Sequence, residues 1–277
     1  MMKKHIQLLL VVAFAYLLAS CAEERTIADT SGFDKKLVEA DGFNLTTYQK
    51  LTDINQPIRF YIEGDGYAWE TSTQPSSDPT PKYPTAFYLA KQDPSPNVVY
   101  IARPCQYSKD SSPKCSMEYW TKRRFSMEVM QAVNKVVNKV KPSPAQRIEL
   151  VGFSGGAVVA VVLSARRSDV IALRTVAGNL DHDYVNKYHH VSPMNESLNA
   201  SDFAHNIKAI PQIHFISTKD KVIPAVVIKK FVEIQESGCA HYYEYEHASH
   251  EEGWGLEWKR LLQIPVKCDA EQTQLSF

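Results

Sequence analysis

A serine set between small residues is the first candidate for chemistry in this sequence. In ELVGFSGGAVV, residues 149–159, Ser154 stands between Gly152 and Gly156 in a GxSxG pattern inside an otherwise apolar stretch. A serine hydroxyl is a weak nucleophile by itself and needs a general base within hydrogen-bond reach, together with a third group that orients the base. The pattern predicts a nucleophile on a sharp turn from strand to helix, where flanking glycines let the two elements approach closely.

Two later positions can supply the base and the group that orients it. Asp220 follows the apolar run IHFIS, and His250 follows the aromatic run AHYYEYEH. Each stands just beyond a predicted strand and ahead of a predicted helix. Ser154 has the same position, on the sharp strand-to-helix turn known as a nucleophile elbow. We therefore assign the nucleophile to Ser154, the orienting acid to Asp220 and the general base to His250. The alternatives that remain open for the acid and the base are Asp181, Asp183 and His247.

With these residues in the order serine, acid, histidine, the chain resembles the α/β-hydrolase superfamily over roughly residues 43–262. The resemblance implies an α/β-hydrolase fold, in which a mainly parallel central sheet carries helices on both faces. It implies acyl transfer to water through an acyl-enzyme, with no metal and no organic cofactor. The expected substrate is a small-molecule or lipid-like carboxylic ester, although the same triad can also cleave amides, peptides and thioesters.

Acyl transfer also needs hydrogen-bond donors for the oxygen that becomes negative. One expected donor is the backbone amide of Gly155, directly after the nucleophile. The second is expected in YIEGDGYAW, because relatives often carry an HGxG-like motif there: Gly64 and Gly66 match the glycines, but Glu63 replaces the histidine. We assign the second donor to the backbone amide of Asp65, with a tight turn of no catalytic role as the alternative. Glu63 must then find a partner different from that of the histidine.

The elements that position these residues follow from hydrophobic patterning. Apolar runs bounded by turn residues predict strands at 43–50, 57–64, 97–104, 147–153, 170–178, 210–217 and 240–247. Helical spacing predicts helices at 117–140, 156–167, 224–237 and 253–262, the first with its Lys and Arg residues on a solvated face. Their alternation implies right-handed crossovers and an α/β sandwich. The loop at 67–83 and the polar excursion at 179–206 are expected to build the substrate pocket.

Composition limits the classes of partner. The 277 residues are 44% hydrophobic and 22% charged, which suits one globular domain, and the formal net charge is zero. Because there is no surplus of positive charge for a polyanion, a nucleic-acid partner is not expected. The sequence does not determine the oligomeric state.

The amino terminus predicts export. MMKKHIQLLLVVAFAYLLASC places Lys3 and Lys4 ahead of an apolar run that is too short for a membrane-spanning helix, which favours a secretory signal peptide over a permanent membrane anchor. The residues LASC resemble the bacterial lipobox, which implies a lipid on Cys21, and Ala22 after it favours the outer membrane. The expected organisation is a signal peptide at 1–20, a lipidated tether at 21–42 and the hydrolase domain at 43–277.

Four cysteines remain after Cys21, and they form two local pairs. In an oxidising compartment they predict the disulfides Cys105–Cys115 and Cys239–Cys268, although sequence alone permits three connectivities and four unpaired thiols are the alternative. No two of them stand at CxxC spacing, so a metal site is not predicted.

A function of a different class also fits the fold. An α/β-hydrolase-like scaffold could bind an envelope partner without catalysis, and a peptidase or amidase could use the same triad. The presence of nucleophile, acid, base and both glycine turns favours catalysis, because a binding module has no need to keep them together.

Overall fold

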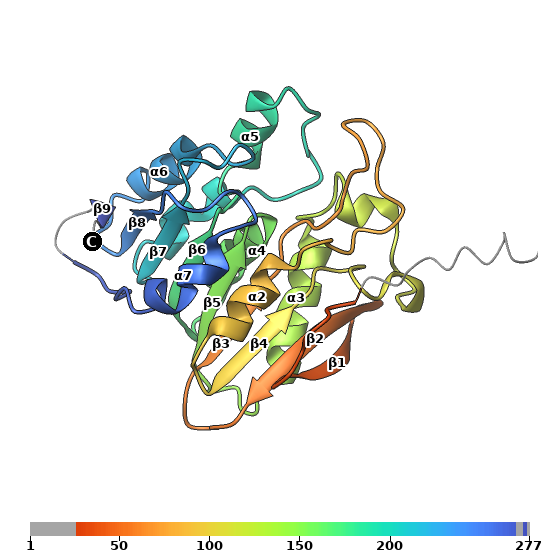
Figure 1. Cartoon of the computed structure of the whole chain (residues 1–277), viewed down its shortest axis with the longest axis horizontal. Helices are drawn as coiled ribbons and strands as arrows, with labels where there is room; N and C mark the ends of the chain where they lie inside the picture. The colour runs from red at the N-terminus through yellow and green to blue at the C-terminus, as the bar shows by residue number, and fades with distance from the viewer. Residues whose placement is uncertain (1–25, 270–273, 276–277) are drawn as a thin grey trace, which may run out of the picture.

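The computed structural model describes residues 26–269 and 274–275. One sheet of nine strands runs through the molecule in the order β1-β2-β4-β3-β5-β6-β7-β8-β9 (Figure 1). The pairs β1/β2 and β2/β4 are antiparallel, and all other neighbouring strands are parallel. The strands are β1 (Asp34–Ala40), β2 (Phe43–Leu51), β3 (Ile58–Ile62), β4 (Asn97–Ile101), β5 (Ile148–Phe153), β6 (Val170–Val176), β7 (Gln212–Ile216), β8 (Ala240–Glu244) and β9 (Gln274–Leu275).

Helices cover both faces of this sheet, as the resemblance implied (Figure 1). The buried side chains of α2 and α7 pack in one core layer, and those of α3, α4 and α6 pack in the other. Phe87 of α2 and Trp258 of α7 are fully buried, and burying one phenylalanine contributes roughly 2 to 3 kcal/mol. The helical elements are α2 (Thr85–Gln92), η1 (Lys109–Ser111), η2 (Met117–Trp120), α3 (Met127–Val140), α4 (Gly155–Arg166), α5 (His182–Tyr188), η3 (Ala200–Ile207), α6 (Ala225–Glu233) and α7 (Trp254–Leu261).

Helix α4 is enclosed on every side. All its residues from Gly155 to Ser164 are buried, because the sheet lies along one side and η3 packs against the helix. A helix that is apolar all round needs this environment. The excursion at 179–206 therefore has a structural role as well, since its second half covers the helix that follows the candidate nucleophile.

Strand β1 corrects the expected domain boundary. It pairs with β2 over its whole length, so residues 34–40 belong to the folded sheet and the segment expected as a tether at 21–42 ends earlier. The strand was missed because most of DKKLVEA is exposed and charged. Charged residues on an edge strand discourage pairing with other chains, and they also hide the apolar alternation that identifies a strand.

Two helical predictions also need correction. The helix expected at 117–140 begins only at Met127, because 117–120 forms the short η2 and Ser126 is extended with φ −62° and ψ 160°. Tertiary contacts hold this segment: the Trp120 indole donates to the carbonyl of Ser76 at 3.1 Å. Helix α2 was not predicted at all, since it is only eight residues long and follows a proline-rich loop.

The structure contains both expected disulfides, Cys105–Cys115 and Cys239–Cys268. Cys21 and the predicted signal peptide at 1–20 lie outside the described residues. Within 26–269 and 274–275, no helix is both long and apolar enough to cross a bilayer.

Candidate active site

Ser154 lies on the tight turn between β5 and α4. Its backbone has φ 49° and ψ −117°, a left-handed conformation that costs energy for a residue with a side chain. Two hydrogen bonds hold it there: its amide donates to the carbonyl of Val176 at 2.9 Å, and its carbonyl accepts from the amide of Asn179 at 3.0 Å. The neighbouring strand β6 and the chain after it therefore keep the serine at the carboxyl edge of the sheet.

The glycines of GxSxG are required by close contact of the backbone. A Cβ atom at Gly152 would lie 2.5 Å from the Cα of Ala157, in the first turn of α4. A Cβ atom at Gly156 would overlap the carbonyl oxygens of Ile62 and Glu63, at the end of β3. Both sites have room only for hydrogen, so these glycines bring the elbow, α4 and the end of β3 together.

His250 connects Ser154 to Asp220. Its Nε2 is 2.9 Å from the Oγ of Ser154, and its Nδ1 is 2.8 Å from Oδ2 of Asp220. The other carboxylate oxygen, Oδ1, accepts from the amides of Val222 at 2.7 Å and Ile223 at 2.9 Å. Because an ionised carboxylate only accepts hydrogen bonds, this network assigns the proton to Nδ1 and leaves Nε2 free to accept from the serine hydroxyl.

The turn after β8 holds His250 in place. The indole of Trp254, at the start of α7, donates to the carbonyls of Ser249 and His250 at 3.1 Å each. The ring of Phe153 lies 5.3 Å from the imidazole, centroid to centroid. The side chain of Asp220 is only 1% exposed, so water competes little for its bond to the histidine.

The alternative acids and base lie elsewhere. Asp181 caps α5, where Oδ1 accepts from the amide of Tyr184 at 3.1 Å and from Nδ2 of Asn199 at 2.8 Å. The side chain of Asp183 is 69% exposed. His247 is exposed, with its ring beside Tyr245. The structure therefore brings Asp220 and His250 to the serine, and it does not bring the three alternatives there.

The two residues expected to supply oxyanion donors, Gly155 and Asp65, belong to segments that lie beside the serine. Gly155 is the first residue of α4, so its amide belongs to the positive end of a buried helix. The segment after β3 lies directly against the elbow: a Cβ atom at Gly64 would be 3.2 Å from the Cβ of Ser154, and one at Gly155 would overlap the carboxylate of Asp65. The Gly64 amide is already used, because it donates to Oε1 of Glu63 at 3.0 Å.

Glu63 finds its partner in α2, the helix that the sequence did not reveal. Its Oε1 also accepts from the amide of Ala86 at 3.3 Å, in the first turn of α2, where a helix has unpaired amides. The side chain is buried, and burial raises the pKa of this carboxyl to about 7, against the opposing effect of the backbone hydrogen bonds. Glu63 thus connects the loop beside Ser154 to α2.

The site also contains two arginines, which the sequence analysis did not single out. Nη1 of Arg124 lies 2.9 Å from Oδ2 of Asp65, and Nη1 of Arg103 lies 3.4 Å from Oδ1 of the same carboxylate. The Arg residues near 117–140 were expected on the solvated face of a helix, which is wrong for Arg124, since it precedes α3 and faces Asp65. Arg103 did carry a usable signal, because it stands two residues beyond a buried strand at the same sheet edge as Ser154.

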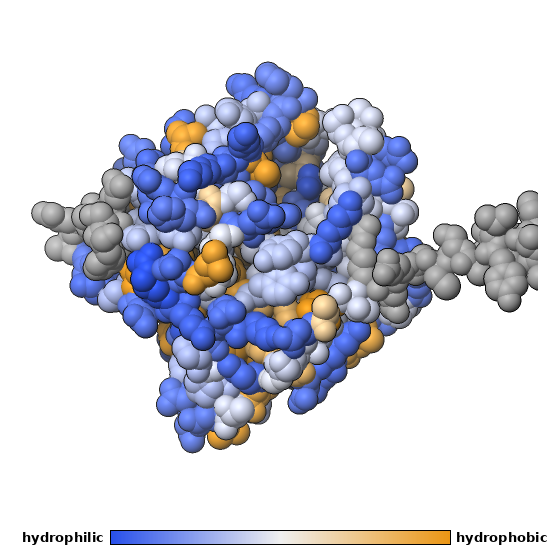
Figure 2. All heavy atoms as spheres, viewed as in Figure 1, coloured by the Kyte–Doolittle hydropathy of each residue, from blue (hydrophilic) through white to orange (hydrophobic). Residues whose placement is uncertain are grey.

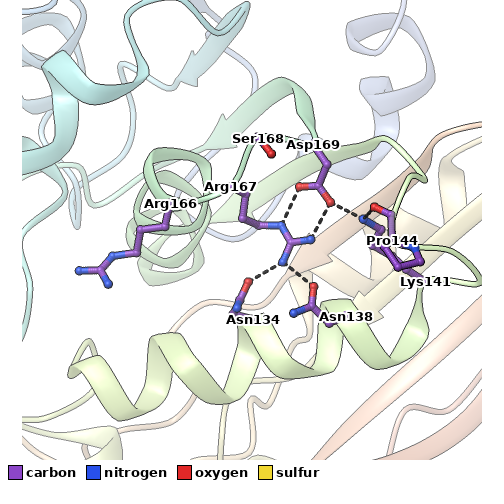
Figure 3. A pocket seen from close by; sticks show the side chains of 8 residues that line it. All are labelled: Asn134, Asn138, Lys141, Pro144, Arg166, Arg167, Ser168 and Asp169. Atoms are coloured by element: carbon purple, nitrogen blue, oxygen red, sulfur yellow. Dashed lines mark hydrogen bonds and ion pairs between the residues drawn. The ribbon is translucent and has the colours of Figure 1, made fainter.

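A pocket elsewhere on the surface does not belong to this site. It has a volume of about 570 Å³ and lies where α4 ends and β6 begins, the opposite edge of the sheet from Ser154. Figure 3 shows that its polar side chains bind one another: the guanidinium of Arg167 bonds both carboxylate oxygens of Asp169, at 2.9 and 2.7 Å, and also reaches Asn138 of α3. The surface is hollowed between the chain after α5 and the loop that follows β3 (Figure 2). Among the described residues, no group of three or more His, Cys, Asp or Glu side chains could hold a metal ion.

Solved structures of similar fold support the architecture. No family model and no curated protein matches the sequence. An alpha-beta serine hydrolase homologue from Coxiella burnetii superposes with a TM-score of 0.58 at 16% identity, covering 86% of this chain and 98% of the other. The esterase domain of a Rhodothermus marinus protein has a TM-score of 0.56 at 11% identity, covering 84% of this chain and 95% of the other. An esterase from Pyrococcus furiosus has a TM-score of 0.56 at 17% identity, covering 86% of this chain and 93% of the other. The chain therefore has the α/β-hydrolase fold, as the sequence predicted.

Proposed function

We propose that this protein is a serine hydrolase that cleaves carboxylic esters by acyl transfer to water. The observation that carries the proposal is the continuous hydrogen-bonded chain from Ser154 through His250 to Asp220. Esterases and serine hydrolases among the structures of similar fold add support. The chemistry needs only these side chains and two backbone amides.

The first half of the reaction acylates the serine. The Oγ of Ser154 attacks the ester carbonyl carbon while Nε2 of His250 takes the hydroxyl proton. Asp220 stabilises the imidazolium that results and keeps the ring in orientation. The carbonyl oxygen becomes negative and is stabilised by the backbone amides of Gly155 and Asp65, worth several kcal/mol when donors are preorganised. The carbon–oxygen bond to the alcohol then breaks as His250 returns the proton to the leaving oxygen.

The second half regenerates the enzyme. A water molecule attacks the acyl carbon, and Nε2 of His250 takes one of its protons. The bond between the acyl carbon and the Oγ of Ser154 breaks, and the proton passes from His250 to the serine oxygen. The products are a carboxylic acid and an alcohol, so each turnover consumes one water.

The substrate binds over the carboxyl edge of the sheet, between the loop at 67–83 and the excursion at 179–206. The hollow between these segments supports this placement (Figure 2). Exchanging either the loop at 67–83 or the part of the excursion between α5 and η3 for a short glycine-containing turn should change the preferred chain length of the ester. If preference is unchanged in both folded variants, the pocket lies elsewhere.

We also propose that the protein is exported and anchored through a lipid on Cys21, on the periplasmic face of the outer membrane. The support is the sequence alone, because Cys21 lies outside the described residues. Cells fed an alkyne analogue of palmitate should label the parent but not Cys21→Ser, and the parent should sediment with outer-membrane vesicles. Equal labelling of both proteins would contradict the lipid assignment.

A fluorophosphonate probe tests the catalytic proposal directly, because it reacts only with an activated serine. A soluble form beginning at residue 22 should be labelled, Ser154→Ala should not, and Asp220→Asn and His250→Ala should be labelled far more slowly. Ser164→Ala is the matched control, since Ser164 lies on α4 with a buried hydroxyl and should not affect labelling. If the folded parent is not labelled, catalysis is refuted and a binding scaffold is favoured.

A further inference from the structure

Two guanidinium groups share one carboxylate beside the nucleophile. Arg103 and Arg124 both bind Asp65, at 3.4 and 2.9 Å, and Arg103 also donates to the carbonyl of Arg124. Both guanidiniums lie over the ring of Phe125, 5.2 and 5.9 Å from its centroid. Since Phe125 is fully buried, the pair rests on a rigid apolar platform.

The donors of this pair are not all used. The Nε of Arg103 is buried and has no hydrogen-bond partner among the described residues. The Nε of Arg124 is directed at the Sδ of Met194 at 2.9 Å, and a thioether sulfur is a weak acceptor. Strong donors beside an active site that lack strong acceptors are what a bound anion would satisfy.

The other acids nearby balance the second positive charge only in part. Glu63 binds backbone amides, and burial raises its pKa to about 7. Asp220 is committed to His250 and to two amides. Burial lowers the pKa of Arg103 to about 10. The charges of Asp65 and, more weakly, of Glu63 act to raise this pKa, and the charge of Arg124 acts to lower it. A second anion would therefore relieve repulsion between the two cations.

The pair is also in the right place to meet a substrate. The carboxylate of Asp65 lies against Gly155, the residue directly after Ser154. Because Arg124 binds the same carboxylate, only that group separates its guanidinium from the turn that carries Ser154. Arg124 also contacts Met194, which belongs to the excursion at 179–206. The side chain of Arg124 is 17% exposed, and that of Arg103 is 5% exposed. Arg124 thus contacts both the loop after β3, through Asp65, and the excursion at 179–206, through Met194.

We propose that Arg124, with Arg103 as its positioning residue, forms a subsite for a carboxylate carried by the ester substrate. The proposal rests on the proposed esterase function and names its substrate class: half-esters of dicarboxylic acids. A guanidinium can bind a carboxylate through two parallel hydrogen bonds, which fixes the orientation of the substrate as well as its charge.

Matched esters test the subsite. The para-nitrophenyl half-ester of adipic acid and para-nitrophenyl hexanoate have acyl chains of the same carbon number, and only the first ends in a carboxylate. The parent should favour the half-ester in kcat/KM. Arg124→Gln should lower the ratio of the two kcat/KM values about tenfold or more, the factor expected for losing a charged hydrogen bond. Arg124→Lys keeps the charge but not the paired geometry, so its ratio of kcat/KM values should lie between those of the parent and Arg124→Gln.

Arg123→Gln is the matched control. Arg123 is next in the chain but its guanidinium binds Glu118 and Glu128, away from Asp65, so this change should leave the ratio unaltered. The same shift in both variants would overturn the proposal, because a general change in surface charge would then explain it.

A second measurement uses the intact arginine pair and needs no turnover. In Ser154→Ala protein, titration calorimetry should show adipate binding about tenfold more tightly than hexanoate, because both carry one carboxylate but only adipate carries a second. Equal affinities would overturn the proposal even if Arg124→Gln does not fold.

The two proposals fail in different ways. If the parent reacts with the fluorophosphonate and cleaves hexanoate ester at least as well as half-ester, with a ratio that Arg124→Gln does not change, the carboxylate subsite is refuted and the hydrolase stands. If the folded parent is neither labelled nor active on either ester, both are refuted.

Discussion

Replacing Glu63 by glutamine should change how the stability of this protein depends on pH. Glu63 is buried, and its Oε1 accepts hydrogen bonds from the amides of Gly64 and Ala86. Glutamine keeps the shape and an oxygen that can accept both bonds, but it cannot ionise. The substitution therefore isolates the cost of placing a negative charge at this position.

The magnitude follows from the pKa of the carboxyl. Burial raises it from 4.5 to about 7 in the folded protein, and at 1.36 kcal/mol per pKa unit the difference is about 3 kcal/mol. The folded state holds the proton more tightly than the unfolded state, so this stability is complete below pH 4.5 and is lost as the pH rises through about 7. About 2.5 kcal/mol of the loss should fall between about pH 5 and about pH 8.

Urea unfolding of the parent and of Glu63→Gln across this pH range measures the effect. The quantity to compare is the difference between the two proteins, because His214 titrates in both. Burial lowers the pKa of His214 from 6.5 to about 3, so its contribution to stability is present above about pH 6.5 and is lost as the pH falls, the opposite sign to that of Glu63. Subtracting the free energies of unfolding of the two proteins removes the contribution of His214, because it is the same in both.

The parent should lose about 2.5 kcal/mol relative to Glu63→Gln on going from about pH 5 to about pH 8. Curves that stay parallel over this range would refute the reasoning, because they would mean that Glu63 is ionised at no greater cost in the folded protein than in water. The groups that face the carboxyl from β4 and the chain after it, Tyr100 and Tyr107, have pKa values raised by burial and stay neutral throughout.

Three further changes test other parts of the structure. Asp220→Asn should lower kcat about 10³- to 10⁴-fold with a small effect on KM, because the amide no longer selects the productive form of the imidazole; a loss below about tenfold in steady-state assays would mean that Asp220 does not orient His250. Gly156→Ala should lower the free energy of unfolding by about 2 kcal/mol or more, since its Cβ would overlap the carbonyl of Ile62, and urea curves matching the parent would contradict that close contact. Replacing Cys239 and Cys268 together by alanine should cost about 3 kcal/mol, because their bond closes a loop with a sequence separation of 29, and an unchanged thermal midpoint would show that the bond does not constrain the unfolded chain.

Much of the fold was readable from local patterns in the sequence. Each apolar run that predicted a strand contains one in the structure, and the buried stretch after Ser154 is a helix. The three candidate residues could be named because each follows a strand, and parallel strands joined by right-handed crossovers bring their carboxyl ends to one edge of the sheet. Chain order and topology alone therefore placed Ser154, Asp220 and His250 near one another.

Other features depend on contacts between segments distant in sequence. Strand β1 was hidden by its exposed charges, and the start of α3 was set by the contacts of the segment before it rather than by periodicity. The sequence favoured Asp220 as the acid but left Asp181 and Asp183 open, since all three follow strands. The structure decided between them, because only Asp220 bonds His250.

The surroundings of the serine show the same division most clearly. The glycines around Ser154 predicted a tight turn. They did not predict that Glu63 would bind α2, or that two arginines would share the carboxylate of Asp65. A periodic pattern reports which face of an element is buried, so strands and helices can be read from it. The pairing of polar side chains on loops has no period, because it depends on where separate loops meet once the sheet has formed, and only the tertiary structure decides that.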